Sequence, residues 1–273
     1  LFVETRLISE VVENKEFLNW LLLQKFDLAF THIFDVCPIG LVHYAKIPSW
    51  IWLSSTDDGE QRSDEFRGKS EEFRWTYVDY RFLEKVMVNS NELYEAPRPT
   101  LSKIVNIGGV GIGFKDANPL PDEFQRIIDV CVGLVVFSFG SVTPSYKMPL
   151  AWKKAFLAAF KNYPEHHFVM KYEGTDLQDH LPSNVHVFKW LPQANLLAHP
   201  KTKALISHGG YNSLQEAIIA GVPLITIPLF GDQPKNAKLA EKHRIAVNLR
   251  KDNLTVDAVV KALEKLLSDR RLD

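Results

Sequence analysis

The stretch Ala204-Leu-Ile-Ser-His-Gly-Gly-Tyr-Asn-Ser-Leu-Gln-Glu216 decides the fold class. A short apolar run over residues 204–207 is followed by two glycines and then by a segment, residues 212–220, with the apolar spacing of a helix. A strand that turns on glycine into a helix is the repeating step of α/β proteins with a parallel sheet. The same step recurs on both sides of this stretch.

Apolar, β-rich runs alternate with amphipathic segments from residue 133 onward. We expect strands over residues 134–139, 167–172, 185–190, 204–207, 223–227 and 245–249, and helices over 149–162, 192–198, 212–220, 234–243 and 256–268. Near-continuous apolar runs are typical of parallel strands that are covered on both faces. The pattern predicts a doubly wound sheet, whose ligands bind at the carboxyl ends of the strands.

The first hundred residues have a less regular α/β rhythm. We expect a strand over 26–34, a helix over 38–46, a strand over 47–53 and a helix that runs into a strand over 75–88. Prolines around residues 97–99 and 119–121 punctuate the chain. We place a domain boundary between residues 117 and 118, which gives an N-terminal domain over 1–117 and a C-terminal domain over 118–273.

Composition excludes several classes of protein. The 273 residues suit two globular domains, and 32 basic against 33 acidic side chains offer no charge excess for a nucleic acid. The sequence as given shows no secretory leader and no apolar run of 18 residues.

Three residue types that often form specific sites give no such signal here. Cys37 and Cys131 make no disulfide framework; the alternatives are a single bridge and two buried free thiols, and we expect the thiols. The nine histidines show no zinc-ligand spacing, so no metal site is expected. The glycines over 108–113 fail the dinucleotide spacing, which argues against a nicotinamide dehydrogenase.

Polar and aromatic residues follow several of the expected strands. The segments are Phe139-Gly-Ser141, Trp190-Leu-Pro-Gln193, His208-Gly-Gly-Tyr-Asn-Ser-Leu-Gln-Glu216 and Asp232-Gln233. A glycine turn that leads into a helix directs backbone N–H groups and the helix dipole toward an anion, so a diphosphate is the natural ligand. A structural interpretation also exists for each segment: Ser213 and Glu216 fit a capping box, Asp232 fits a helix N-cap before Pro234, and Trp190 fits a core position. Their recurrence at successive strand ends favours a ligand site.

These motifs resemble the donor-binding signature of the UDP-glycosyltransferases, particularly the invertebrate relatives of the animal UDP-glucuronosyltransferases. The resemblance implies the GT-B fold, an α/β fold of two Rossmann-like domains with parallel sheets. The C-terminal domain would bind the UDP-sugar and the N-terminal domain, which we expect to be incomplete here, the acceptor. By resemblance, Trp190 would stack on uracil, Gln193 would bond to the uridine and Glu216 to the ribose. The diphosphate would be held by Ser141, His208, Gly210, Asn212 and Ser213, and the sugar by Asp232 and Gln233.

The implied reaction is the transfer of glucose or glucuronic acid from UDP-glucose or UDP-glucuronic acid to a hydroxyl group of a small lipophilic acceptor, with inversion. No Asp-x-Asp motif occurs, so neither a metal nor another cofactor is indicated. In the family an N-terminal histidine is the general base and an acidic residue orients it. We expect the segment with that histidine to precede this chain. His32 occupies the position of the acid, and Asp35 is either a substitute for it or a solvated loop carboxylate.

The resemblance also implies a setting for the parent protein. Animal relatives act in detoxification on the lumenal side of the endoplasmic reticulum membrane, which they reach by a signal peptide and keep by a C-terminal helix; neither is present in this sequence. A homo-oligomer is compatible with the family, and a nucleic-acid partner is not expected. We expect this piece alone to be inactive. The alternative is a nucleotide-sugar-binding module without catalysis, either a pseudoenzyme or a truncation product.

Overall fold

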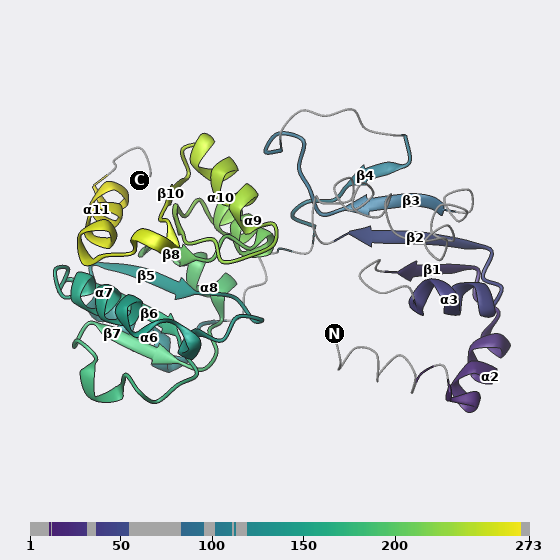
Figure 1. Ribbon diagram of the computed structural model, residues 1–273, viewed down its shortest axis with the longest axis horizontal. Coiled ribbons are helices and arrows are strands. Elements are labelled where there is room, and N and C mark those ends of the chain that lie inside the picture. Colours follow the sequence, from purple (N-terminus) through teal and green to yellow (C-terminus); the bar gives the residue numbers. More distant parts are fainter. Residues whose placement is uncertain are drawn as a thin grey trace. The chain divides into compact units, whose positions relative to one another are not determined.

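A computed structural model of the chain describes residues 11, 13–31, 37–54, 83–95, 102–110, 112 and 119–268 (Figure 1). The chain divides into two compact units, Leu1–Gly108 and Gly109–Asp273. Residues 113–118, beside the expected boundary, lie outside the described part, and that boundary stays a prediction. Each unit contains a sheet in which every strand pairing is parallel.

Unit 1 has a four-stranded sheet in the order β1-β2-β3-β4. Its strands are β1 (Leu28–Thr31), β2 (Ser49–Ser54), β3 (Leu83–Val88) and β4 (Ile104–Asn106), and its helices are α2 (Lys15–Gln24) and α3 (Cys37–Tyr44). The strands and helix expected between residues 26 and 53 are confirmed, whereas α2 was not anticipated. Asn14 begins α2, since its Oδ1 accepts a hydrogen bond from the N–H of Phe17 at 3.0 Å. In the segment expected over 75–88, the strand is confirmed as β3, and the part before residue 83, where a helix was expected, lies outside the described residues.

Unit 2 has a six-stranded sheet in the order β10-β9-β8-β5-β6-β7. Its strands are β5 (Gly133–Ser138), β6 (His166–Lys171), β7 (Val185–Phe188), β8 (Thr202–Ser207), β9 (Leu224–Thr226) and β10 (Ala246–Asn248). All six expected strands are therefore confirmed, with ends displaced by one or two residues. When the six strands are numbered 1 to 6 in chain order and the sheet is read from the β7 edge, the order is 3-2-1-4-5-6, the Rossmann order. The strand order reverses between β5 and β8.

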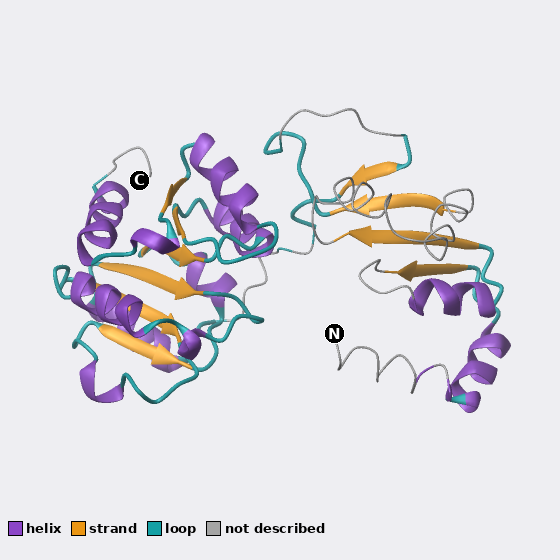
Figure 2. Ribbon diagram, viewed as in Figure 1, coloured by secondary structure: helices purple, strands orange, loops and turns teal. Residues whose placement is uncertain are grey.

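Helices cover both faces of this sheet (Figure 2). They are α6 (Asp122–Val130), α7 (Leu150–Phe160), α8 (Gln193–Leu197), α9 (Tyr211–Ala220), α10 (Gln233–Lys242) and α11 (Val256–Leu267), with short 3-10 helices at η3 (Ser145–Lys147), η4 (Gln178–His180) and η5 (Lys251–Asn253). Side chains of α7 and α11 share one core with β5, β6 and β8. On the opposite face, Phe124 of α6 contacts Phe188 of β7, with ring centroids 4.5 Å apart. The five expected helices are confirmed, and α6 is an addition.

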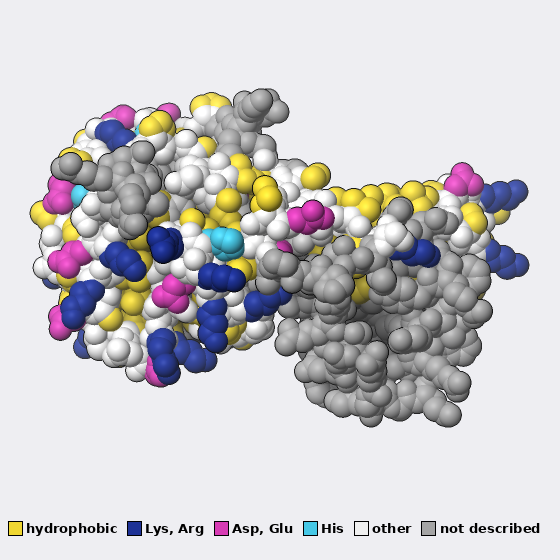
Figure 3. Space-filling model, turned by 90° about the horizontal axis from the view of Figure 1, so that it is seen from above, with side chains coloured by type: hydrophobic (Ala, Val, Ile, Leu, Met, Phe, Trp, Pro, Cys, Tyr) yellow, Lys and Arg dark blue, Asp and Glu magenta, His cyan; other side chains and the backbone are white. Residues whose placement is uncertain are grey.

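Three further expectations concern the surface and the thiols. None of the helices among the described residues is long and apolar enough to cross a membrane. Cys131 is a buried free thiol, as expected, and the side chain of Cys37 lies outside the described part. On the face of unit 2 drawn in Figure 3, basic and acidic side chains are interspersed. This agrees with the balanced net charge of −1.

Candidate functional site

A polar row crosses the sheet of unit 2 at the carboxyl ends of four strands. Ser138 of β5 lies beside Ser207 of β8, Ser207 beside Thr226 of β9, and Thr226 beside Asn248 of β10. The first three side chains are buried. Because the row includes β5 and β8, it marks the point in a Rossmann sheet where ligands bind.

Two glycine turns leave this edge in the same way. The Oγ of Ser138 accepts a hydrogen bond from the N–H of Gly140 at 3.2 Å, and the Oγ of Ser207 accepts one from Gly209 at 3.4 Å. Both glycines have a positive φ, +79° and +85°, which residues with a side chain rarely adopt. Serine hydroxyls that bond two residues ahead stabilise turns. The two turns expected from the sequence are therefore present on neighbouring strands.

The imidazole of His208 lies against both turns. A Cβ on Gly140 would stand 2.9 Å from the Cε1 of His208, and a Cβ on Gly210 would stand 2.7 Å from it. Both distances are shorter than real contacts, so a larger residue at either position would displace the ring. The Nδ1 of His208 lies 3.3 Å from the Oγ of Ser207. Gly140 and Gly210 thus make room for the histidine, a packing role that the sequence did not reveal.

The charge state of His208 is set by burial. Burial lowers the pKa of the imidazole, and the carboxylate of Asp232 raises it by a smaller amount, so the pKa lies below its ordinary value. His208 is neutral at pH 7. A neutral imidazole offers one N–H donor to an anion and adds no positive charge.

Gln193, Ser213 and Glu216 form one hydrogen-bonded cluster. The Nε2 of Gln193, the first residue of α8, donates to the Oε2 of Glu216 at 2.7 Å and to the Oγ of Ser213 at 3.1 Å. The proposed capping box is wrong, because α9 begins at Tyr211 and its N-cap is Gly210. Ser213 and Glu216 lie one turn apart inside the helix, and so share a face that Gln193 contacts. Burial raises the pKa of Glu216, and the Gln193 bond lowers it by less.

Trp190 follows β7 and lies on the surface. Its exposed fraction is 68%, so the core interpretation of this residue is wrong. The Nζ of Lys171 lies 5.7 Å from the centroid of the indole ring. An exposed indole with a cation beside it is a platform on which a flat base can stack.

Asp232 and Gln233 stand at the start of α10. Asp232 occupies the N-cap position, as expected, but its side chain makes no cap bond and instead accepts from the Nδ2 of Asn236 at 2.8 Å. Gln233 is buried, and its Oε1 accepts from the N–H groups of Leu229 at 2.8 Å and Phe230 at 3.0 Å. Because both lone pairs of this oxygen are used, a ligand would meet only the amide N–H groups of Gln233.

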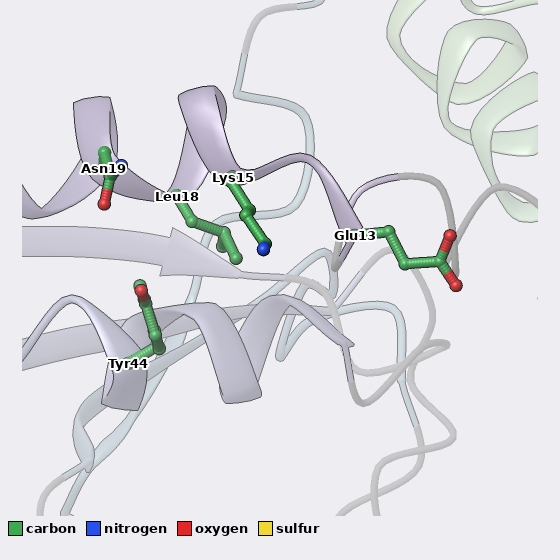
Figure 4. A pocket seen from close by; sticks show the side chains of 5 residues that line it. All are labelled: Glu13, Lys15, Leu18, Asn19 and Tyr44. Carbon is green, nitrogen blue, oxygen red and sulfur yellow. The ribbon is translucent and has the colours of Figure 1, made fainter.

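The other expected residues fall into two groups. Ser141 and Asn212 are exposed and follow the two glycine turns. His32 and Asp35 lie outside the described residues. A surface hollow in unit 1, lined by Glu13, Lys15, Leu18, Asn19 and Tyr44 (Figure 4), contains none of the expected site residues.

Lys171 is a site residue that the sequence analysis missed. It is the last residue of β6, it is only 7% exposed, and its Nζ donates to the carbonyl oxygen of Gly140 at 2.8 Å. The available signal was a lysine directly after the apolar run Phe168-Val-Met170, at the end of an expected strand. Among the described residues, no group of three or more His, Cys, Asp or Glu is arranged to hold a metal ion.

Comparisons with known proteins identify the family of the chain. The family model of UDP-glucoronosyl and UDP-glucosyl transferases matches residues 80–272. The chain belongs to this family. Putative UDP-glucuronosyltransferase ugt-48 of Caenorhabditis elegans is 29% identical to this chain over an alignment of 320 positions, gaps included. The alignment covers 95% of this chain and 60% of the relative. Putative UDP-glucuronosyltransferase ugt-55 of the same organism is 36% identical, over 71% of this chain and 38% of the relative.

A solved structure supports the fold of the chain. A UDP-glucosyltransferase from Polygonum tinctorium, described as capable of glucosylating indoxyl, superposes with a TM-score of 0.71 at 19% identity and covers 97% of this chain and 73% of its own. The fold is therefore GT-B, built from two Rossmann-like units with parallel sheets, as the resemblance implied. The chain spans 60% or less of the length of the two curated relatives.

Proposed function

We propose that this chain carries the donor site of a UDP-glycosyltransferase that transfers a glucosyl or glucuronosyl group from UDP to hydroxyl groups of small lipophilic acceptors. The observation that carries the proposal is the bonding of Gln193 to both Ser213 and Glu216 at the switch point of the sheet. Three residues that the family signature separates in sequence meet there, beside the two glycine turns. The exposed face of Trp190 adds a surface for the uracil.

The reaction that we propose proceeds with inversion and without a metal. The acceptor oxygen forms a bond to the anomeric carbon, the bond from that carbon to the diphosphate oxygen breaks, and the acceptor proton passes to a general base. The leaving UDP carries the displaced electron pair. In this chain, the N-terminus of α9 and the N–H of His208 would stabilise that charge. The roles of His32 and Asp35 near the base, and of Ser141, Gly210 and Asn212 at the diphosphate, rest on the resemblance.

Titration of the 273-residue chain with UDP by calorimetry tests the donor site. We expect binding that is weakened by about 5–150-fold in Trp190→Ala, since stacking on an aromatic ring contributes about 1–3 kcal/mol. Trp20→Ala is the matched control, because Trp20 is also exposed, at 50%, and belongs to unit 1. A folded chain that does not bind UDP refutes the donor site.

Catalysis is tested with the full-length protein. Incubation with UDP-glucose or UDP-glucuronic acid and a panel of phenolic acceptors should release UDP and yield a β-glycoside. Both donors are included because the family description covers both sugars. Binding of UDP without turnover by a folded full-length protein would instead identify a non-catalytic nucleotide-sugar-binding protein.

The cellular setting belongs to the same proposal. We place the parent protein on the lumenal side of the endoplasmic reticulum membrane, in detoxification, and the support for this is the family resemblance alone. Fractionation of cells that express the full-length protein should recover it with microsomes, protected from added protease. Recovery in the cytosolic fraction would contradict this placement.

A further inference from the structure

Lys171 is a buried cation whose contacts reach three different loops. Its Nζ donates to the carbonyl oxygen of Gly140 in the turn after β5 and to the Oε1 of Glu173 after β6, both at 2.8 Å. The same Nζ lies 5.7 Å from the ring of Trp190, which follows β7. A buried ammonium group is costly unless it is paired, so these contacts hold the lysine in one place.

Glu173 extends the connection to the end of the β5 loop. Its Oε2 accepts a hydrogen bond from the N–H of Ser145 at 2.8 Å. Burial raises the pKa of Glu173, but hydrogen bonds from Lys171 and from backbone N–H groups outweigh this, so the pKa lies below its ordinary value. The side chain of Glu173 is therefore a charged carboxylate at neutral pH.

We propose that Lys171 is a positioning residue for the nucleotide: it fixes the Gly140 turn, beside the diphosphate, relative to the indole of Trp190, beside the base. The inference rests on the proposed donor site. Two of the three N–H groups of Lys171 are already engaged with Gly140 and Glu173. In the proposal its effect on UDP is exerted through these two partners and the ring of Trp190.

Lys153 provides a closely matched control. It is also 7% exposed, and its Nζ donates to the carbonyl oxygen of Tyr146 at 2.7 Å and to the Oδ2 of Asp176 at 2.8 Å. It even lies over an aromatic ring, 5.3 Å from the centroid of Tyr172. Loss of Lys153 therefore removes the same kinds of contact without touching Gly140 or Trp190.

The experiment compares UDP with uridine, which lacks the phosphates, on the wild-type chain and on Lys171→Met, Lys171→Arg and Lys153→Met. A hydrogen bond to a charged group is worth enough to change affinity by about tenfold or more. We expect Lys171→Met to lose about tenfold or more in UDP affinity and less in uridine affinity, and Lys171→Arg to recover part of the loss. Lys153→Met should keep the wild-type ratio of UDP affinity to uridine affinity. If this ratio is unchanged in Lys171→Met, or changes equally in Lys153→Met, the inference is overturned.

Hydrogen exchange separates this inference from the proposed function, because it needs no ligand. Amides of residues 139–143 should exchange faster in Lys171→Met than in wild type, and at the wild-type rate in Lys153→Met. Faster exchange in Lys171→Met, together with a wild-type chain that does not bind UDP, would contradict the donor site and support the positioning of the turn. UDP binding together with unchanged exchange in Lys171→Met would contradict the positioning role. If Lys171→Met does not fold, Glu173→Gln, which keeps the shape of that side chain and removes its charge, takes its place in both comparisons.

Discussion

Glu216→Gln should weaken nucleotide binding and stabilise the unliganded protein. The Oε2 of Glu216 accepts a hydrogen bond from the Nε2 of Gln193 at 2.7 Å. A glutamine at this position has the same shape, and its amide oxygen can still accept that bond. The substitution therefore removes the charge and leaves the cluster in place.

The structure sets the direction and size of both effects. A hydrogen bond from a ribose hydroxyl is worth about 1.5–3 kcal/mol to a carboxylate and about 0.5–1.5 kcal/mol to a neutral amide, so UDP affinity should fall by about 5–13-fold. Burial raises the pKa of Glu216 in the folded state. The stability from this group is thus fully present below its unfolded pKa and is lost as the pH rises through the folded pKa. At pH 7 the buried carboxylate of Glu216 destabilises the folded state. The Glu216→Gln substitution should therefore raise the free energy of unfolding by about 0.5–2 kcal/mol.

The assay pairs calorimetric titration with denaturant unfolding at pH 7. Uridine is titrated as well, because it has no phosphate that ionises in this range: its affinity for wild type should fall as the pH drops through the raised pKa of Glu216, whereas that for Glu216→Gln should stay level. Glu165→Gln is the control, since hydrogen bonds lower the pKa of Glu165 and its removal should bring no gain in stability. Wild-type UDP affinity in Glu216→Gln would refute the role of the carboxylate.

Three further predictions test neighbouring parts of the fold. In Gly140→Ala the new Cβ would stand 2.9 Å from the ring of His208, and the alanine would have to adopt a φ of +79°. Calorimetry should therefore show a fall in UDP affinity of about tenfold or more. Asp232→Asn should lower the pKa of His208 further, because the carboxylate now raises it; an NMR titration of the imidazole that shows no change would contradict this. Phe160→Ala should cost about 3–5 kcal/mol in denaturant unfolding, because the ring is fully buried and stacks on Phe168 with centroids 3.9 Å apart.

The fold of unit 2 could be predicted because its strands are nearly pure apolar runs between glycine and proline. Residues Gly133–Ser138 are all buried, and such a run can only be a covered strand or a core helix. The miss at α6 has a different cause. Phe124 and Ile128 are its buried residues, four positions apart, and the acidic Asp122 and Glu123 mark a first turn. A weak helical spacing next to the apolar run of β5 was overlooked, although the signal was there.

The site was predicted in its parts but not in its bonding. The local pattern Ser213-x-x-Glu216 looks the same whether the helix begins at the serine or two residues earlier, and only the structure shows that it begins at Tyr211. The partner of both residues, Gln193, is 23 positions from Glu216 in the chain. Lys171 and Gly140 are 31 positions apart. Contacts between strand ends depend on the order of strands in the sheet, which a local sequence pattern does not contain.

The serine-supported turns engage two backbone amides at the carboxyl ends of the strands. The N–H groups of Gly140 and Gly209 bond to Ser138 and Ser207, so the two glycines that the motif displays do not supply the donors. The cap residue of α9, Gly210, has no side chain to bond the first turn of the helix. The helix dipole adds a partial positive charge at the same end. In the proposed donor site the diphosphate would lie at the start of α9, and the glycine turns would bring the neutral His208 beside it.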